Sequence, residues 1–284
     1  MTPLQHKIDF AVMLRVQHAN PNGDPLNGNR PRTDYNGYGE ISDVCLKRKM
    51  RDRLMDAGHM IFVQPDDRRN DDARSLRERA EKKLGNQFGS GETARLANET
   101  WLDVRAFGQL FALPRKSKYK ASDTDTDTDG NAGVSIPIRG PVTVQSAFSL
   151  QPVDVTSSQI TRSVSGDGDG SKRGSDTMGT KHRVDSAVYV FYGSMNPQLA
   201  ERTGFSDADA ESIKKILPRL FENDASAARP EGSMEVLKVL WWKHNSKSGQ
   251  LSSAKVHRSL KPSPDGTYTL DELDGLKPEE IDGF

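Results

Sequence analysis

Three aspartates in the N-terminal part of the sequence could hold a divalent metal ion. Asp24 and Asp34 lie in the segment NPNGDPLNGNRPRTD (residues 20–34), and Asp43 follows shortly after it. Carboxylate oxygens bind Mg²⁺, and a bound ion could assist the cleavage of a phosphodiester bond. The alternative is structural, with Asp24 closing an Asx turn and Asp43 interacting with a helix dipole. Because the sequence holds no ordered set of ligands, we expect no metal, no cofactor and no catalytic residue.

Basic residues are concentrated just after these aspartates. Five of the seven residues from Lys47 to Arg53 are Lys or Arg, and residues 20–34 add two arginines. A helix would bring Lys47 and Arg51 to one face, and the free N–H groups at its N-terminus suit a phosphate. The run is either a phosphate-contacting surface for nucleic acid or the solvated face of an ordinary helix. The candidate contacts are Arg30, Arg32, Lys47, Arg48 and Arg51.

Other motifs indicate less chemistry. The stretch SDTDTDTDG partly matches a calcium-binding loop through Asp125, Asp127 and Asp129, but the position that requires Glu holds Ile136. An acidic loop is the preferred interpretation. His182 lies in a basic KHR triplet and resembles a contact residue more than a catalyst. Neither a Walker loop nor a nucleophile elbow is present.

The composition points to a chain with much polar surface. Only 34% of the 284 residues are hydrophobic and 28% are charged, so much of the length must lie in polar loops or on surfaces that meet a polar partner. Forty basic residues balance forty acidic ones, so only the distribution of charge is informative. The single cysteine, Cys45, excludes an internal disulfide, and we expect it to be buried in a helix. No signal peptide or membrane-length apolar run is present, which favours a cytoplasmic protein.

The hydrophobic pattern predicts the elements that must position these residues. Apolar residues alternate over 8–16, which predicts a half-buried strand, and 41–58 reads as a helix with Ser42 as N-cap and Gly58 at its exit. Further strands are predicted at 140–153, 184–194 and 233–244, and a helix kinked by Pro218 at 206–224. Residues 66–99 read as a solvent-facing helical insertion, and 115–133 and 163–179 as loops. This order predicts an α+β fold, a ferredoxin-like sheet with helices on one face and large insertions.

Six segments, taken in chain order, resemble the CRISPR-associated Cas-seven family, in the form that serves as backbone subunit of type I-C Cascade (the Csd-two type). They span about residues 7–250, and their ordered series is more specific than any one motif. The segments are NPNGDPLNGNRPRTD, GYGEISDVCLKRKMRDRL, DVRAFGQLF, IRGPVTVQSAFSLQPV, TMGTKHRVDSAVYVFYGSMNPQLAERTGF and LFENDASAARPEGSMEVLKVLWWKHNSKSG.

The resemblance implies a modified RNA-recognition-motif fold shaped like a hand. It would be a single domain over 1–284, with a fingers-type insertion at about 60–135 and a projecting hairpin, the thumb, at about 155–183. Residues 265–284 form an acidic tail outside the recognised segments, which we expect to be peripheral. The implied contacts on the hairpin are Met178, Lys181 and His182.

The resemblance also implies a function and partners. Copies of the chain would polymerise along one CRISPR RNA and present its bases to target DNA, together with other Cascade subunits and with no membrane partner. We expect no enzymatic activity. Two alternatives stay open, a metal-dependent ribonuclease that uses Asp34 and a single-copy RNA-binding module.

Overall fold

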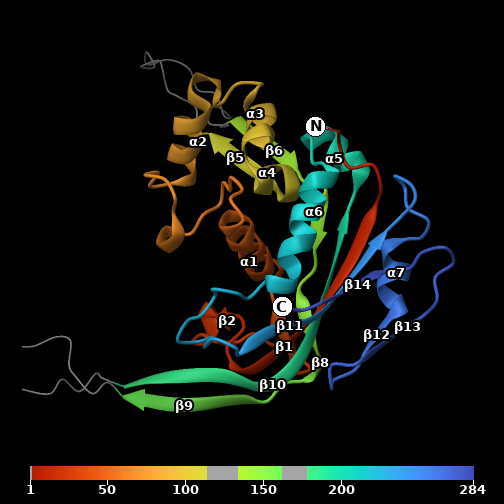
Figure 1. The fold of residues 1–284 in the computed structure, drawn as a ribbon. Helices are drawn as coiled ribbons and strands as arrows, with labels where there is room; N and C mark the ends of the chain where they lie inside the picture. Colours follow the sequence, from red (N-terminus) through yellow and green to blue (C-terminus); the bar gives the residue numbers. More distant parts are fainter. Residues whose placement is uncertain (1, 114–133, 162–177) are drawn as a thin grey trace, which may run out of the picture.

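The centre of the fold is an antiparallel β-sheet. The computed structural model describes residues 2–113, 134–161 and 178–284. The strands of the sheet lie in the order β14-β11-β1-β10-β8-β4, and β7 and β9 also pair with β10 (Figure 1). Together with the helices, this sheet confirms the expected α+β class. The strand bounds are β1 (Ile8–Ala19), β4 (Tyr38–Ile41), β7 (Val142–Val144), β8 (Ala147–Pro152), β9 (Val155–Thr161), β10 (Met178–Met195), β11 (Met234–Lys243) and β14 (Glu279–Asp282).

Strand β1 is buried on both faces. The apolar residues at its even positions lie in the main core together with α1 (Asp43–Asp56) and α6 (Asp207–Ile216). Ala11 and Met13, at odd positions, lie in a second core on the opposite face. The prediction of a half-buried strand with helices on one face only is therefore wrong. In the sequence, the polar residue Asp9 at an odd position suggested that this face meets solvent. Ala11 and Met13 on the same face are apolar, however, and other apolar residues must pack over them.

Helix α1 has the predicted start. Ser42 is its N-cap, and the Ser42 hydroxyl accepts a hydrogen bond from the Cys45 amide N–H at 3.3 Å. Beyond the C-terminal end, Gly58 has φ +86°, a left-handed conformation that glycine adopts without strain. Cys45 is half-buried rather than fully buried, and this burial raises the pKa of its thiol. The predicted frame of the helix is confirmed.

Two predicted elements are interrupted. The strand expected at 140–153 is split into β7 and β8, and the amide N–H of Gln145 between them still donates to the Tyr192 carbonyl at 2.8 Å. The helix expected at 206–224 ends as α6 and continues as a 3-10 turn, η4 (Leu217–Arg219). Pro218 has no N–H to donate to the preceding turn, so the α-helical pattern stops before it.

The acidic C-terminal segment is part of the sheet and not a peripheral tail. Helix α7 (Ser253–Ser259) and strands β12 (Leu260–Pro262) and β13 (Tyr268–Leu270) contribute to the second core. Leu276 is buried in the same core, and β14 then pairs with β11 as the outermost strand. The prediction of a peripheral tail is wrong because Tyr268, Leu270, Leu273 and Leu276 pack in the second core, and Ile281 of β14 packs against the main core.

A buried carboxylate joins this C-terminal part to β1. Asp9 is fully buried, with His244 Nε2 at 2.9 Å and Lys7 Nζ at 3.3 Å from the same carboxylate oxygen. His257 of α7 lies 3.6 Å from the other oxygen. Burial disfavours the ionised form of Asp9, but hydrogen bonds from His244 and Ser253 outweigh it and lower its pKa. Burial also lowers the pKa of His257, against the attraction of Asp9.

The first insertion forms a module with its own apolar core. Its elements gather on one side of the sheet in Figure 1. Phe62, Trp101 and Phe111 pack there, with ring centroids 4.7 Å and 5.3 Å from that of Phe62. The elements are η2 (Asp66–Arg68), α2 (Leu76–Leu84), η3 (Gly85–Gln87), α3 (Thr93–Thr100), α4 (Leu102–Phe107), β5 (Gly108–Leu113) and β6 (Val134–Arg139).

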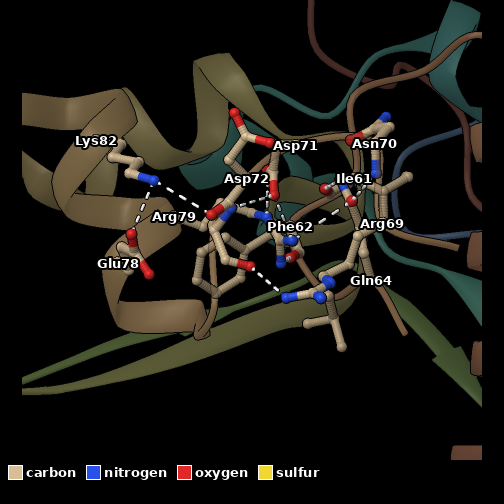
Figure 2. A network of polar contacts seen from close by, with 12 residues as sticks. Ile61, Phe62, Gln64, Arg69, Asn70, Asp71, Asp72, Glu78, Arg79 and Lys82 are labelled. Atoms are coloured by element: carbon tan, nitrogen blue, oxygen red, sulfur yellow. Dashed lines mark hydrogen bonds and ion pairs between the residues drawn. The ribbon is translucent and has the colours of Figure 1, made fainter. Parts of the chain in front are cut away.

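Charged residues of the insertion contribute to its structure. Figure 2 shows Arg79 of α2, only 5% exposed, whose guanidinium donates to both carboxylate oxygens of Asp71 at 2.6 and 2.8 Å. A further N–H of Arg79 donates to the Phe62 carbonyl at 2.8 Å. The prediction of a solvent-facing insertion is therefore wrong for this face of α2, because a buried arginine ties the helix to the segment before it.

The second insertion begins as a two-stranded extension. Strand β9 pairs antiparallel with the first part of β10, from Met178 to Val184, and Figure 1 shows both strands extending away from the body of the molecule. Both strands fall within the range 155–183 where the hairpin was expected, and the hairpin itself stays a prediction. Most of the loop predicted at 163–179, and the acidic repeat with Asp125, Asp127, Asp129 and Gly130, lie outside the described residues.

Candidate nucleic-acid interface

The cations of α1 are neutralised by neighbouring carboxylates. Each of its five basic side chains lies within 4.0 Å of an aspartate. The pairs are Lys47–Asp43 (3.0 Å), Arg48–Asp52 (3.1 Å), Lys49–Asp224, Arg51–Asp103 (3.0 Å) and Arg53–Asp56 (3.0 Å). Some of these partners are neighbours on the helix, and others are distant in the sequence. The predicted basic face therefore presents much less net charge than its sequence suggests.

Arg51 illustrates the structural use of these cations. Its Asp103 partner is 1% exposed and also accepts the amide N–H groups of Phe62 and Val63 at 2.7 and 3.0 Å. The Arg51 guanidinium lies 5.1 Å from the centre of the Phe107 ring, within cation–π distance. This pair joins α1 to the insertion and turns Arg51 away from the role of a free phosphate ligand.

The opening segment, residues 20–34, folds as a tight turn-rich loop. Its two-residue strands β2 (Gly23–Asp24) and β3 (Arg30–Pro31) flank the 3-10 turn η1 (Pro25–Asn27). Gly28, with φ +57°, reverses the chain after η1. The many Asn, Gly and Pro residues of this segment thus form the turns of a loop that brings Arg30 back beside the sheet.

The three aspartates considered as metal ligands do not form one site. The Asp24 carboxylate accepts the Leu26 N–H at 3.2 Å and lies 3.6 Å from Arg32. The Asp34 carboxylate accepts two backbone N–H groups, from Asn36 and Tyr38, at 2.8 and 2.9 Å. Asp43 pairs with Lys47, as described above. Among the described residues, no three His, Cys, Asp or Glu side chains are arranged to hold a metal ion.

Arg30 joins the opening loop to the base of the extension. Its Nη1 donates to the Ser157 hydroxyl of β9 at 3.2 Å, and that hydroxyl lies 2.8 Å from Nδ1 of His182 on β10. The Ser157 hydroxyl can thus donate to Nδ1, and among the described residues the His182 Nε2–H and the remaining Arg30 donors have no other partner, so that another ligand could bind them. Two residues predicted from separate parts of the sequence are therefore connected through one serine.

A cavity of about 350 Å³ lies beside this connection. We call it the hairpin-base cavity. Four segments line it: the opening loop, β9, β10 and the turn before β11. The lining residues are Asn20, Gly23, Asn29, Ile160, Thr180, Lys181, His182, Ala227, Ala228 and Arg229.

Cations and apolar groups both occur around the hairpin-base cavity. Neither Arg30 nor Lys181 has a carboxylate within 4.0 Å in the parts of the chain that the structure describes. Met178 and Ile160 are 63% and 51% exposed on the two strands of the extension. Unneutralised cations beside exposed apolar side chains can hold the phosphates and contact the bases of a nucleic acid.

The sequence predicted some of this site and missed other parts. Arg30, Lys181 and His182 were predicted individually, and the structure brings them to one place. Arg32, Lys47, Arg48 and Arg51 lie within 4.0 Å of carboxylates instead, and their contact with RNA stays a prediction. Ser157 and the turn at Ala227–Arg229 were not predicted. A serine in a polar strand and two alanines in a loop carry no sequence signal, since their roles come from long-range pairing.

One further observation concerns membranes. Within the described part of the chain, no helix combines the length and the apolar character that a membrane crossing requires.

Comparison with known proteins gives one consistent family. The family model of the CRISPR-associated protein Cas7 matches residues 6–277. The CRISPR-associated protein Cas7 of Haloferax volcanii is 30% identical over 235 residues, which cover 80% of this chain and 67% of that protein.

Similar solved structures include a chain of a CRISPR RNA-guided surveillance complex in a pre-nicking state, with 14% identity and a TM-score of 0.45 over 83% of this chain and 78% of that chain. Another is a chain of a CRISPR RNA-guided surveillance complex, with 16% identity and a TM-score of 0.45 over 92% of this chain and 77% of that chain. The family model covers nearly the whole chain, and the protein therefore belongs to the CRISPR-associated Cas7 family.

Proposed function

We propose that this chain is an RNA-binding backbone subunit of a CRISPR surveillance complex. The observation that carries the proposal is the hairpin-base cavity, which Lys181 and His182 line and beside which Arg30 is connected to His182 through Ser157. Arg and Lys side chains without carboxylate partners bind phosphates strongly, because phosphate contact releases counterions from the nucleic acid. Membership of the Cas7 family supports CRISPR RNA as the ligand.

Recognition at this site would depend on the RNA backbone more than on its sequence. Phosphate contacts fix the position of a strand without reading its bases. We propose Arg30 and Lys181 as the principal phosphate contacts, with Met178 and His182 beside them. The other residues predicted from the sequence, Arg32, Lys47, Arg48 and Arg51, lie within 4.0 Å of carboxylates and contribute little to RNA binding in this proposal.

We extend the proposal to the fold and to the complex. The chain order is β1, α1, β8, β10, α6 and β11, apart from inserted elements, and the strands lie in the sheet in the order β11-β1-β10-β8. This arrangement supports a modified ferredoxin-like or RNA-recognition-motif core.

In this proposal, copies of the chain polymerise along one CRISPR RNA and present it to target DNA together with other Cascade subunits. The type I-C assignment rests on the sequence resemblance alone.

We also propose that the subunit has no nuclease activity of its own. The Asp34 carboxylate, the candidate for a ribonuclease mechanism, accepts two backbone N–H groups of its own loop. A carboxylate that closes a turn in this way has a structural role that its sequence position alone does not reveal.

The test is to express the chain with a CRISPR array, sequence the RNA that co-purifies and measure the mass of the complex on RNAs of increasing length. The mass should increase in steps with length. A one-to-one complex on every length would support the single-copy module instead. Cleavage of labelled complementary RNA in magnesium at regular intervals, abolished in Asp34→Ala, would support the ribonuclease.

A further inference from the structure

We propose that Asp224, an acidic residue, positions one wall of the hairpin-base cavity and is therefore required for tight RNA binding. This inference rests on the proposed function. It concerns the turn Ser226–Arg229, which follows η4 and precedes β11. Electrostatics alone would give the opposite expectation, since a negative charge near an RNA surface repels phosphates.

The turn is closed by its own backbone. The Ser226 N–H donates to the Arg229 carbonyl at 2.8 Å, and the Arg229 N–H donates to the Ser226 carbonyl at 3.1 Å. Ala227, Ala228 and Arg229 then face the hairpin-base cavity. A unit of this kind can move as one piece, so its position depends on how it is attached to the rest of the molecule.

Two attachments hold the turn. At the front, the amide N–H of Asn20 donates to the Ala228 carbonyl at 2.8 Å, and the Asn20 side chain donates to the Asn29 carbonyl at 2.6 Å. At the back, the Asp224 carboxylate pairs with Lys49 of α1 through one oxygen and accepts from Arg229 Nε at 3.1 Å through the other. Asp224 therefore connects the turn to a helix of the main core.

A second cavity borders the turn. It has a volume of about 320 Å³ and is lined by Asp224, Ser226 and Arg229 together with Arg48 and Lys49 of α1. Arg229 lines this cavity and the hairpin-base cavity as well. Because the turn borders two cavities, the Asp224 bridge is one of the contacts that can fix where the turn lies.

The residue before Asp224 has a left-handed backbone. Asn223 has φ +52°, in the region that asparagine adopts more readily than most other non-glycine residues. Next to it is the Lys49–Asp224 pair, in which the Lys49 side chain is only 8% exposed. A largely buried ion pair between the turn and α1 is consistent with a connection that defines geometry rather than adding surface charge.

The experiment compares two substitutions that remove the same charge from the same loop. Asp224→Asn should weaken binding of end-labelled single-stranded RNA by about tenfold, the reduction expected when one charge-assisted hydrogen bond is removed. The control Glu231→Gln changes an exposed side chain beyond the turn and should leave binding unchanged or slightly tighter. Lys49→Met should weaken binding as Asp224→Asn does, and the double variant should bind no more weakly than either single one, because both act through one ion pair.

Thermal melting of each variant separates positioning from a purely structural role. A purely structural role would lower the melting temperature of Asp224→Asn and leave the RNA affinity of the folded protein unchanged, which would overturn the inference. Tighter binding by both Asp224→Asn and Glu231→Gln would overturn it as well. Arg30→Ala with Lys181→Ala, measured in the same assay, tests the interface itself. If that variant binds weakly while Asp224→Asn binds normally, the proposed function stands and the positioning role does not.

Discussion

Helix α1 and the base of the β9–β10 extension are both rich in basic residues, but they use them differently. In α1 every cation has an aspartate within 4.0 Å. At the extension, Arg30 and Lys181 have no such partner in the described parts of the chain. A run of basic residues in a sequence therefore measures composition, while the charge available to a ligand depends on pairing in the folded chain. The longer run of basic residues, in α1, is therefore the one whose cations are all paired with aspartates.

The largest effect should come from breaking a buried pair of α1. Asp103→Ala leaves Arg51 and two backbone N–H groups without their acceptor. Removing one partner of a buried pair costs about 3–5 kcal/mol, so the free energy of unfolding in urea should fall by about that amount. Glu99→Ala, which removes an exposed partner of Arg95, is the control and should change stability by less than about 1 kcal/mol. Equal effects of the two variants would show that α1 does not depend on its buried pairs.

The next effect concerns RNA affinity and not stability. Replacing Arg30 and Lys181 by Ala should weaken binding of single-stranded RNA by about tenfold for each charge-assisted hydrogen bond that is removed. The melting temperature should stay close to that of the unchanged protein, because neither side chain has an ion-pair partner among the described residues. Fluorescence anisotropy on two RNAs of unrelated sequence gives the affinities. A reduction confined to one sequence would argue against phosphate contacts.

A third prediction concerns how the free energy of unfolding depends on pH. The pKa of His257 is lowered by burial below its ordinary value of 6.5, so the unfolded chain takes up a proton at a higher pH than the folded chain does. Stability should therefore fall as pH decreases through about 6.5. The lowered pKa of Asp9 adds a further decrease in stability as pH falls below 3.8. Urea unfolding across this range should show the first slope reduced in His257→Gln.

The matched control for this pH experiment is His18→Gln, which changes an exposed histidine with a side chain 67% exposed. Its pH dependence of unfolding should resemble that of the unchanged protein. If His257→Gln keeps the full slope, the buried group beside Asp9 is not the source of the decrease.

The smallest effect is expected for an exposed pair of α1. Lys47 pairs with Asp43 at i, i+4, and both side chains are partly exposed. Such pairs contribute about 0.3–0.5 kcal/mol, so Lys47→Ala should change the urea midpoint only slightly. RNA affinity should also change little. A clear decrease of affinity in this variant would restore α1 as a principal RNA contact.

The sequence predicted local features well. Alternating apolar residues located β1, Ser42 marked the start of α1, and the Asn, Gly and Pro content of residues 20–34 indicated a turn-rich loop. These features depend on neighbours within a few residues, where backbone sterics and capping act directly. The order of strands and helices was therefore largely predictable.

Pairing between distant residues was not predictable in the same way. Lys49 meets Asp224, and Arg51 meets Asp103, across 175 and 52 residues respectively. A single sequence contains no signal for such partners, so the cations of α1 read as free. The second core was not predicted for the same reason, because Ala11 and Met13 are covered by residues from the C-terminal part of the chain.

The most direct test of this account is the salt dependence of RNA binding in two matched double variants. Arg30→Ala with Lys181→Ala should reduce the slope of log affinity against log salt by roughly 0.7 for each phosphate that is no longer bound, or about 1.4 in all. Lys47→Ala with Arg48→Ala should leave the slope unchanged, because those cations are already paired with Asp43 and Asp52. The reverse result, an unchanged slope for the first variant and a reduced slope for the second, would contradict the account.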